Sequence, residues 1–240
     1  MLIEFASVDG RYESLPQPVP TSSVIPDWWR QMPKTIRLDG DGIKPESPTV
    51  KACIPFLDTL RTGYVIPMWA DLAIGLNNEN GEALLQWRNQ PWPIADERHW
   101  GGFVNKENGV GLPGTEGVPN PNAFILSNPW QIKTPEGYSC LFTPVLNANL
   151  PLQFSSGIVN TDTYHNTINF PFFIKDRYVG VLKRGTPLIQ IIPFKPDEWE
   201  HEVRAMTDED TMDLNRSRGN ISTVFNSGYL ENHGCPVRHT

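Results

Sequence analysis

Three features are scarce in this 240-residue chain: cysteines, long apolar runs and clusters of basic residues. The three cysteines, Cys53, Cys140 and Cys235, lie far apart and none belongs to a CxxC pair, which argues against a disulfide framework or a zinc knuckle. No stretch reaches the roughly 18 apolar residues of a membrane span, and the N-terminus lacks the basic and apolar parts of a signal peptide. We therefore expect a soluble protein of the cytoplasm.

Basic residues are outnumbered by acidic ones. Lys and Arg total 20 against 27 for Asp and Glu, which gives a formal net charge of −7. Without a basic run the chain offers no electrostatic footprint for duplex nucleic acid or for an anionic membrane, so neither is expected as a partner. No two of its five histidines have the H-x-H or H-x-x-x-H spacing, so no metal site is predicted.

Proline and aromatic residues are abundant, with 23 Pro, 11 Phe and 8 Trp. This composition argues against disorder and long helices and favours short strands joined by structured loops. We therefore predict a mainly β fold with few short helices. We expect three parts: a Pro- and Trp-rich extension at 1–50 packed on the core, a β core at 51–206, and a C-terminal arm at 207–240.

Turn residues, caps and apolar periodicity predict individual elements as well. They comprise helices at 26–32, 52–61 and 207–215, strands at 2–8, 64–74, 82–88 and 199–206, a hairpin turn at 77–81, a long loop at 89–122, and an extended segment over the last 25 residues. Strand 188–192 has apolar residues on both faces, which indicates a central strand or one at a subunit contact.

The most informative stretch is 135–194, where three motifs follow one another. They are PEGY at 135–138 with Pro144, GIVNTDTY at 157–164, and KRGTPLIQ at 183–190 with Pro193. Their order and spacing resemble the P-x-G-Y…P, G-V-I-D-x-D-Y and K-x-G-D-R-I-A-Q…P motifs of deoxyuridine triphosphatases (dUTPases). The resemblance implies a β-clip core, a distorted barrel of the kind found in dUTPases and dCTP deaminases. The whole chain also resembles an uncharacterised family met in bacteriophage and bacterial genomes.

The chain departs from the dUTPase pattern where that pattern carries its chemistry. Asn160 stands in place of the catalytic Asp, and a carboxamide does not accept a proton from water near pH 7. Val145, Leu146 and Asn147 follow Pro144, where the family supplies Arg and Ser to phosphate. The catalytic motifs are therefore degenerate, and we lean towards a protein that is not an enzyme.

The resemblance also implies a ligand-binding set. Tyr164 corresponds to the Tyr that stacks on deoxyribose and Gln190 to a Gln that contacts phosphate, and we add Asn160 and His165 as neighbouring polar groups. A site would then lie between the 160–166 turn and the strand that carries Gln190. The polar residues 162–165 equally fit a tight turn whose side chains satisfy backbone groups, and the sequence leaves both interpretations open.

Three functions follow from these motifs. The first is a catalytically degenerate dUTPase-like protein, phage-related and acting in the host cell cytoplasm, that binds a nucleotide-like small molecule or a protein partner and needs no cofactor. The second is an active nucleotide hydrolase or deaminase with a rearranged site, in which Asp162 is the base and Mg²⁺ the cofactor of hydrolysis. The third is a phage structural or assembly protein. Because the families that this chain resembles build their sites between three subunits, we expect a homotrimer.

Overall fold

Short strands make up most of the regular structure in the computed structural model, which describes residues 1–7, 12–37, 47–79, 81, 83–88, 123–175 and 178–223. Two compact units divide the chain. The first contains Met1–Val24 and Gly63–Pro196, and the second contains Ile25–Thr62 and Asp197–Thr240. These boundaries differ from the expected ones, because the first 24 residues join the β unit while 25–62 do not.

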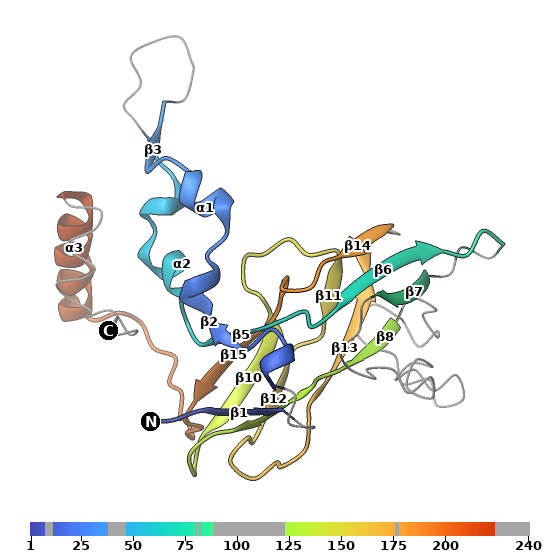
Figure 1. Ribbon diagram of the computed structural model, residues 1–240. Helices are drawn as coiled ribbons and strands as arrows, with labels where there is room; N and C mark the ends of the chain where they lie inside the picture. Colours follow the sequence, from blue (N-terminus) through green and yellow to red (C-terminus); the bar gives the residue numbers. More distant parts are fainter. Residues whose placement is uncertain are drawn as a thin grey trace. The chain divides into compact units, whose positions relative to one another are not determined.

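The first unit holds most of the strands (Figure 1). They are β1 (Glu4–Ser7), β2 (Val19–Pro20), β5 (Tyr64–Pro67), β6 (Asp71–Leu76), β7 (Ala83–Arg88), β8 (Ala123–Ser127), β9 (Trp130–Lys133), β10 (Ser139–Pro144), β11 (Leu152–Phe154), β12 (Gly157–Val159), β13 (Asn169–Ile174), β14 (Gly180–Leu182) and β15 (Pro187–Phe194). Two short 3₁₀ turns, Tyr12–Ser14 and Thr21–Val24, complete it. The predicted mainly β class with few short helices is confirmed.

The largest sheet of this unit has five strands in the order β12-β10-β15-β5-β2, and every described pairing in it is antiparallel. Two three-stranded sheets, β11-β13-β8 and β14-β6-β7, and the pair β1-β9 complete the unit. Strands far apart in the sequence are neighbours in the large sheet, as β5 beside β15 shows. Its hydrogen bonds therefore close long loops.

Strand β15 is the centre of that sheet, as its two apolar faces predict. It lies between β10 and β5. Leu188 and Ile191 are fully buried and Ile189 is 1% exposed, so both faces are covered within a single chain. A subunit contact is therefore not required to cover this strand. The predicted trimer then depends on the family resemblance alone.

The region expected as one strand at 64–74 forms two strands in different sheets. The chain leaves β5 at Pro67, passes a bend at Met68, Trp69 and Ala70, and enters β6 at Asp71. The three bend residues are fully buried, so the chain leaves one sheet for the other inside the core. The apolar periodicity of the sequence does not reveal such a buried bend. The hairpin predicted after it is confirmed, because β6 pairs with β7 across the turn at 77–81.

The second unit contains the helices. They are α1 (Asp27–Gln31), α2 (Ile54–Thr59) and α3 (Asp208–Thr223), together with the 3₁₀ turn Val50–Ala52 and the strand pair β3 (Thr35–Ile36) and β4 (Ser47–Pro48). Trp29 stacks on Phe56 with ring centroids 5.3 Å apart, and Trp28 meets both rings edge-on. Trp29 is 5% exposed and anchors this packing, whereas Trp28 is 41% exposed.

Two expectations for the C-terminal region are wrong. The strand predicted at 199–206 does not form, and the segment has neither helix nor strand. Helix α3 starts where its cap predicts but continues to Thr223, well past the expected end near Asn215, so residues 216–223 are not an extended arm. Within the described ranges, no helix is long and apolar enough to cross a membrane.

Candidate functional site

The loop that follows β12 belongs to the second sequence motif and is hydrogen-bonded to the turn of the first. Gly137, in the turn between β9 and β10, has a φ of 78°, a left-handed conformation that favours glycine. Its backbone N–H donates to Asp162 Oδ2 at 2.9 Å. The acidic residue of one motif therefore fixes the turn of the other across 25 residues of sequence. Asp162 therefore has a structural role in this loop.

Asn160 lies at the start of the loop, opposite the first residue of β10. The side-chain hydroxyl of Ser139 donates to Asn160 Oδ1 at 2.9 Å. The backbone carbonyl of Asn160 accepts from the N–H groups of Thr163 at 3.1 Å and Tyr164 at 2.8 Å. These bonds close a tight turn, while Asn160 itself is exposed and Tyr164 is 43% exposed. Turn and ligand surface are therefore compatible, because the backbone closes the turn while Asn160 and Tyr164 stay exposed.

Hydroxyl groups on the core side of the loop hold it in place through hydrogen bonds. Thr161 is fully buried, and its Oγ1 lies 2.7 Å from Thr134 Oγ1 and 3.3 Å from Cys140 Sγ. Burial raises the pKa of the Cys140 thiol, and the hydrogen bond with Thr161 opposes part of that rise. Cys140 is therefore a neutral packing residue. Thr161, Thr134 and Ser139 were not predicted as site residues, although each is a small hydroxyl residue next to a turn of the motifs.

His165 is placed at the far end of the same loop. His165 is exposed, and its backbone carbonyl accepts a hydrogen bond from the side-chain amide of Gln131 in β9. The contact tethers the loop end by the backbone.

Gln190 lies apart from these residues. Its side chain is fully buried, and its Oε1 accepts from the backbone N–H of Leu146 at 3.0 Å. It faces Thr143 across the sheet, whereas Asn160 follows β12 at the Ser139 end of β10. The two places are four positions apart on β10, from Ser139 to Thr143, which is about 13 Å along the strand at the usual rise per residue. A single chain therefore does not bring Gln190 into one site with Asn160.

The turn after β10 carries no cationic group. Val145 N–H donates to Leu188 O at 3.4 Å and Ala148 N–H to Val145 O at 3.1 Å, with Asn147 at a φ of 60°. Asn tolerates this left-handed conformation better than most residues. Val145 and Leu146 are half-buried, so the segment packs on the sheet at the position where the dUTPase motif presents its guanidinium.

The assembled site is thus a polar loop with one aromatic face. Asn160 offers an amide, Tyr164 a ring and His165 an imidazole, and the carboxylate of Asp162 is engaged with Gly137. Across the described ranges, no group of three or more His, Cys, Asp or Glu residues is arranged to hold a metal ion. The long loop predicted at 89–122 lies outside the described residues.

No protein-family model and no curated protein matches the chain. Among solved structures it is similar to a mutant dUTPase from phage phi11 of S. aureus, at 9% identity and a TM-score of 0.36, covering 87% of this chain and 98% of that one. It is also similar to two mutants of the dUTPase of Staphylococcus bacteriophage 80alpha. The first matches at 9% identity and a TM-score of 0.34, covering 86% of this chain and 97% of that one. The second, solved with dUpNHpp, matches at 8% identity and a TM-score of 0.34, with 86% and 90% covered.

Proposed function

We propose that this chain is a dUTPase-like β-clip protein with a degenerate active site, phage-related, that binds a nucleotide-like small molecule or a protein partner at the 160–165 loop. One observation carries the proposal. Asn160, at the position of the dUTPase catalytic carboxylate, is held by Ser139 through its amide oxygen. A site built around that bond keeps a defined polar surface and has no general base at its centre.

The geometry of Asn160 supports binding in a specific way. Because Oδ1 accepts from Ser139 Oγ, the amide is oriented with its NH₂ group away from Ser139. An oriented donor on an exposed turn suits a carbonyl or phosphate oxygen. Tyr164, two-fifths exposed beside it, offers a flat face worth about 1 kcal/mol against a ring.

The competing function is catalysis with Asp162 as the base. One oxygen of that carboxylate accepts the Gly137 N–H, which ties the group to a structural turn and points its charge towards the backbone. A base in this position has to act without losing that bond. The half-buried Val145 and Leu146 also leave the developing phosphate charge without a guanidinium.

A turnover assay decides between the two functions. Purified protein with Mg²⁺ is expected to release no pyrophosphate from dUTP above background, because loss of a general base alone removes about 10²–10⁴-fold in rate. The Asn160→Asp variant is the matched control. Restoring the carboxylate is expected to give at most weak turnover, since no guanidinium is regained. Release by the wild-type protein at tens of turnovers per second, abolished by Asp162→Asn, would establish the enzyme instead.

Ligand binding is tested by thermal shift with deoxyribonucleotides, followed by calorimetry on any compound that stabilises the protein. Tyr164→Ala is expected to weaken binding about fivefold or more, the equivalent of about 1 kcal/mol of lost ring contact. Trp28→Ala is the control, with altered stability and unchanged affinity. Gln190→Ala is expected to lower stability, because it leaves the Leu146 N–H without its partner. Unchanged affinity in Tyr164→Ala would remove the loop as the site.

A further inference from the structure

Residues 198–205 follow β15 with a strand-like pattern in the sequence. Charged and uncharged side chains alternate without exception, with Glu198, Glu200, Glu202 and Arg204 on one side and Trp199, His201, Val203 and Ala205 on the other. Strict alternation is typical of a strand with one covered face. We call residues 198–205 the alternating segment.

The structure gives the alternating segment no strand partner among the described residues. It forms neither helix nor strand, and none of its backbone groups pairs with the backbone of another described residue. Trp199 is 88% exposed and Val203 is 93% exposed. Apolar surface on this scale favours association, because an aromatic side chain buries about 150–250 Å² when it finds a partner.

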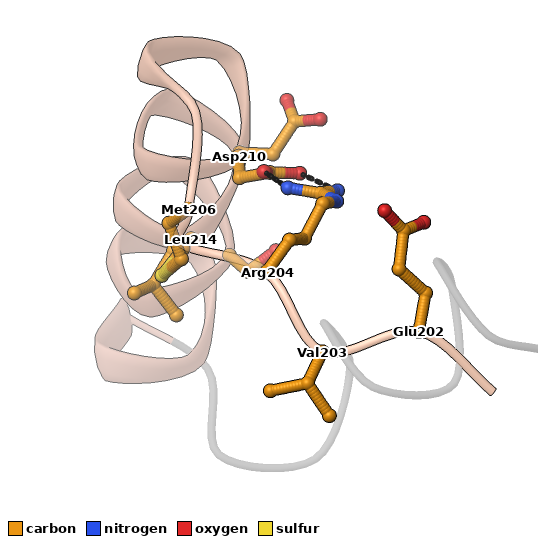
Figure 2. Close-up of a pocket in the computed structure, with 8 residues that line it drawn as sticks. Glu202, Val203, Arg204, Met206, Asp210 and Leu214 are labelled. Atoms are coloured by element: carbon orange, nitrogen blue, oxygen red, sulfur yellow. Dashed lines mark hydrogen bonds and ion pairs between the residues drawn. The ribbon is translucent and has the colours of Figure 1, made fainter.

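A shallow hollow opens where the alternating segment meets α3. Val203, Met206 and Leu214 supply its apolar surface, and the ion pair between Arg204 and Asp210 forms one wall. Figure 2 shows Met206 and Leu214, which both line the hollow, Val203 projecting from the segment, and Arg204 directed at Asp210. The hollow therefore offers an apolar surface next to fixed charges.

We propose that the alternating segment pairs antiparallel with the same segment of a second copy of this chain, so that Trp199 of each copy covers Val203 of the other at its hollow. The sequence is complementary to itself in this register. Trp199 faces Val203 twice, an aromatic with a β-branched residue, and Glu198 faces Arg204 twice, an acid with a base. His201 then faces His201 on the two-fold axis.

The two pairs of Trp199 with Val203 favour this register over its alternatives. It also sets Glu200 against Glu202, a like-charge contact on the exposed face that salt screens. Shifting the strands by two residues in either direction removes the Trp199 and Val203 pair. The contact is isologous, with the same surface used by both copies, so it closes as a pair and does not extend into a filament.

A cysteine at the axis tests the pairing in the full-length protein. His201→Cys should form a disulfide-linked species of twice the 27.1 kDa chain mass under mild oxidation, because facing residues have Cβ atoms about 4.5–5.5 Å apart. Glu198→Cys is the matched control, since its two copies would lie about 20 Å apart along the ribbon. Both positions are exposed, so neither substitution is expected to impair folding.

The expected result is that His201→Cys links most of the protein while Glu198→Cys and the wild-type chain stay at background on a non-reducing gel. Adding Trp199→Glu to His201→Cys should lower the linked fraction at least tenfold. Linkage of His201→Cys no greater than that of Glu198→Cys would overturn the proposal. Stronger linkage through Glu202→Cys or Val203→Cys would overturn the register, and linkage unaffected by Trp199→Glu would overturn the role of the indole.

Discussion

Cys140 and Thr161 illustrate how single residues support the 160–165 loop. Thr161 reaches under the loop to Thr134 and Cys140, and both Thr161 and Cys140 are fully buried. A buried hydroxyl needs a partner, because leaving it unpaired costs about 1–3 kcal/mol. The thiol supplies that partner without bringing a charge into the core.

The buried thiol predicts a pH dependence of stability. Burial raises the pKa of Cys140 above its ordinary value of 9.0, so the folded protein holds this proton more tightly than the unfolded chain. The stabilisation is fully present below the unfolded pKa and is lost as pH rises through the folded value. Urea unfolding from pH 7 to 10.5 should therefore show stability falling above about pH 9.

Cys140→Ala is the control for this fall. The variant is expected to be less stable at neutral pH, since it loses packed volume, but to have a flatter stability profile above pH 9. A profile as steep as that of the wild type would mean that another group controls the alkaline limit.

At the scale of elements, the turn into β5 depends on a glycine that touches β15. Gly63 has a φ of 74°, and a Cβ built on it would lie 2.0 Å from the backbone oxygen of Ile191. Backbone atoms in the middle of a sheet cannot shift to make room, so both conformation and space require glycine here. Gly63 therefore has a role in strand packing.

Gly63→Ala is expected to destabilise the protein by more than about 2 kcal/mol, from left-handed strain combined with the clash against β15. Gly75→Ala is the matched control, because a Cβ there meets nothing within 4 Å. Its effect should be within about 1 kcal/mol in the same denaturant titration. Equal losses in the two variants would contradict the packing argument for Gly63.

At the scale of the whole molecule, the number of chains per assembly remains a prediction. The central strand β15 is covered inside one chain, which removes one physical reason for a trimer. The separation of Gln190 from Asn160 gives no other physical reason for a trimer. Gln190 is buried in each copy, so it is not exposed to complete the Asn160 site of a neighbouring copy. The trimer is therefore expected from the motif resemblance, in which three subunits share their sites.

Light scattering on the Trp199→Glu variant tests the trimer without the contact proposed for the alternating segment. A mass of three times 27.1 kDa is expected at micromolar concentration. The wild-type protein should be heavier, since each copy can also pair through its alternating segment. A variant that scatters as a single chain would refute the trimer.

The sequence by itself determined the local features of this protein. The β class, the hairpin at 77–81 and the start of α3 all follow from period, caps and turn residues. Each depends on the backbone preferences of a few consecutive residues, which the sequence shows directly.

Only the tertiary structure decided which distant residues meet. It joined Asp162 to Gly137, buried Gln190 on Leu146, divided 64–74 between two sheets, and left the alternating segment unpaired despite its strand pattern. Strand pairing closes long loops and depends on register, and a pattern of period two states which face is apolar without naming the strand that will cover it.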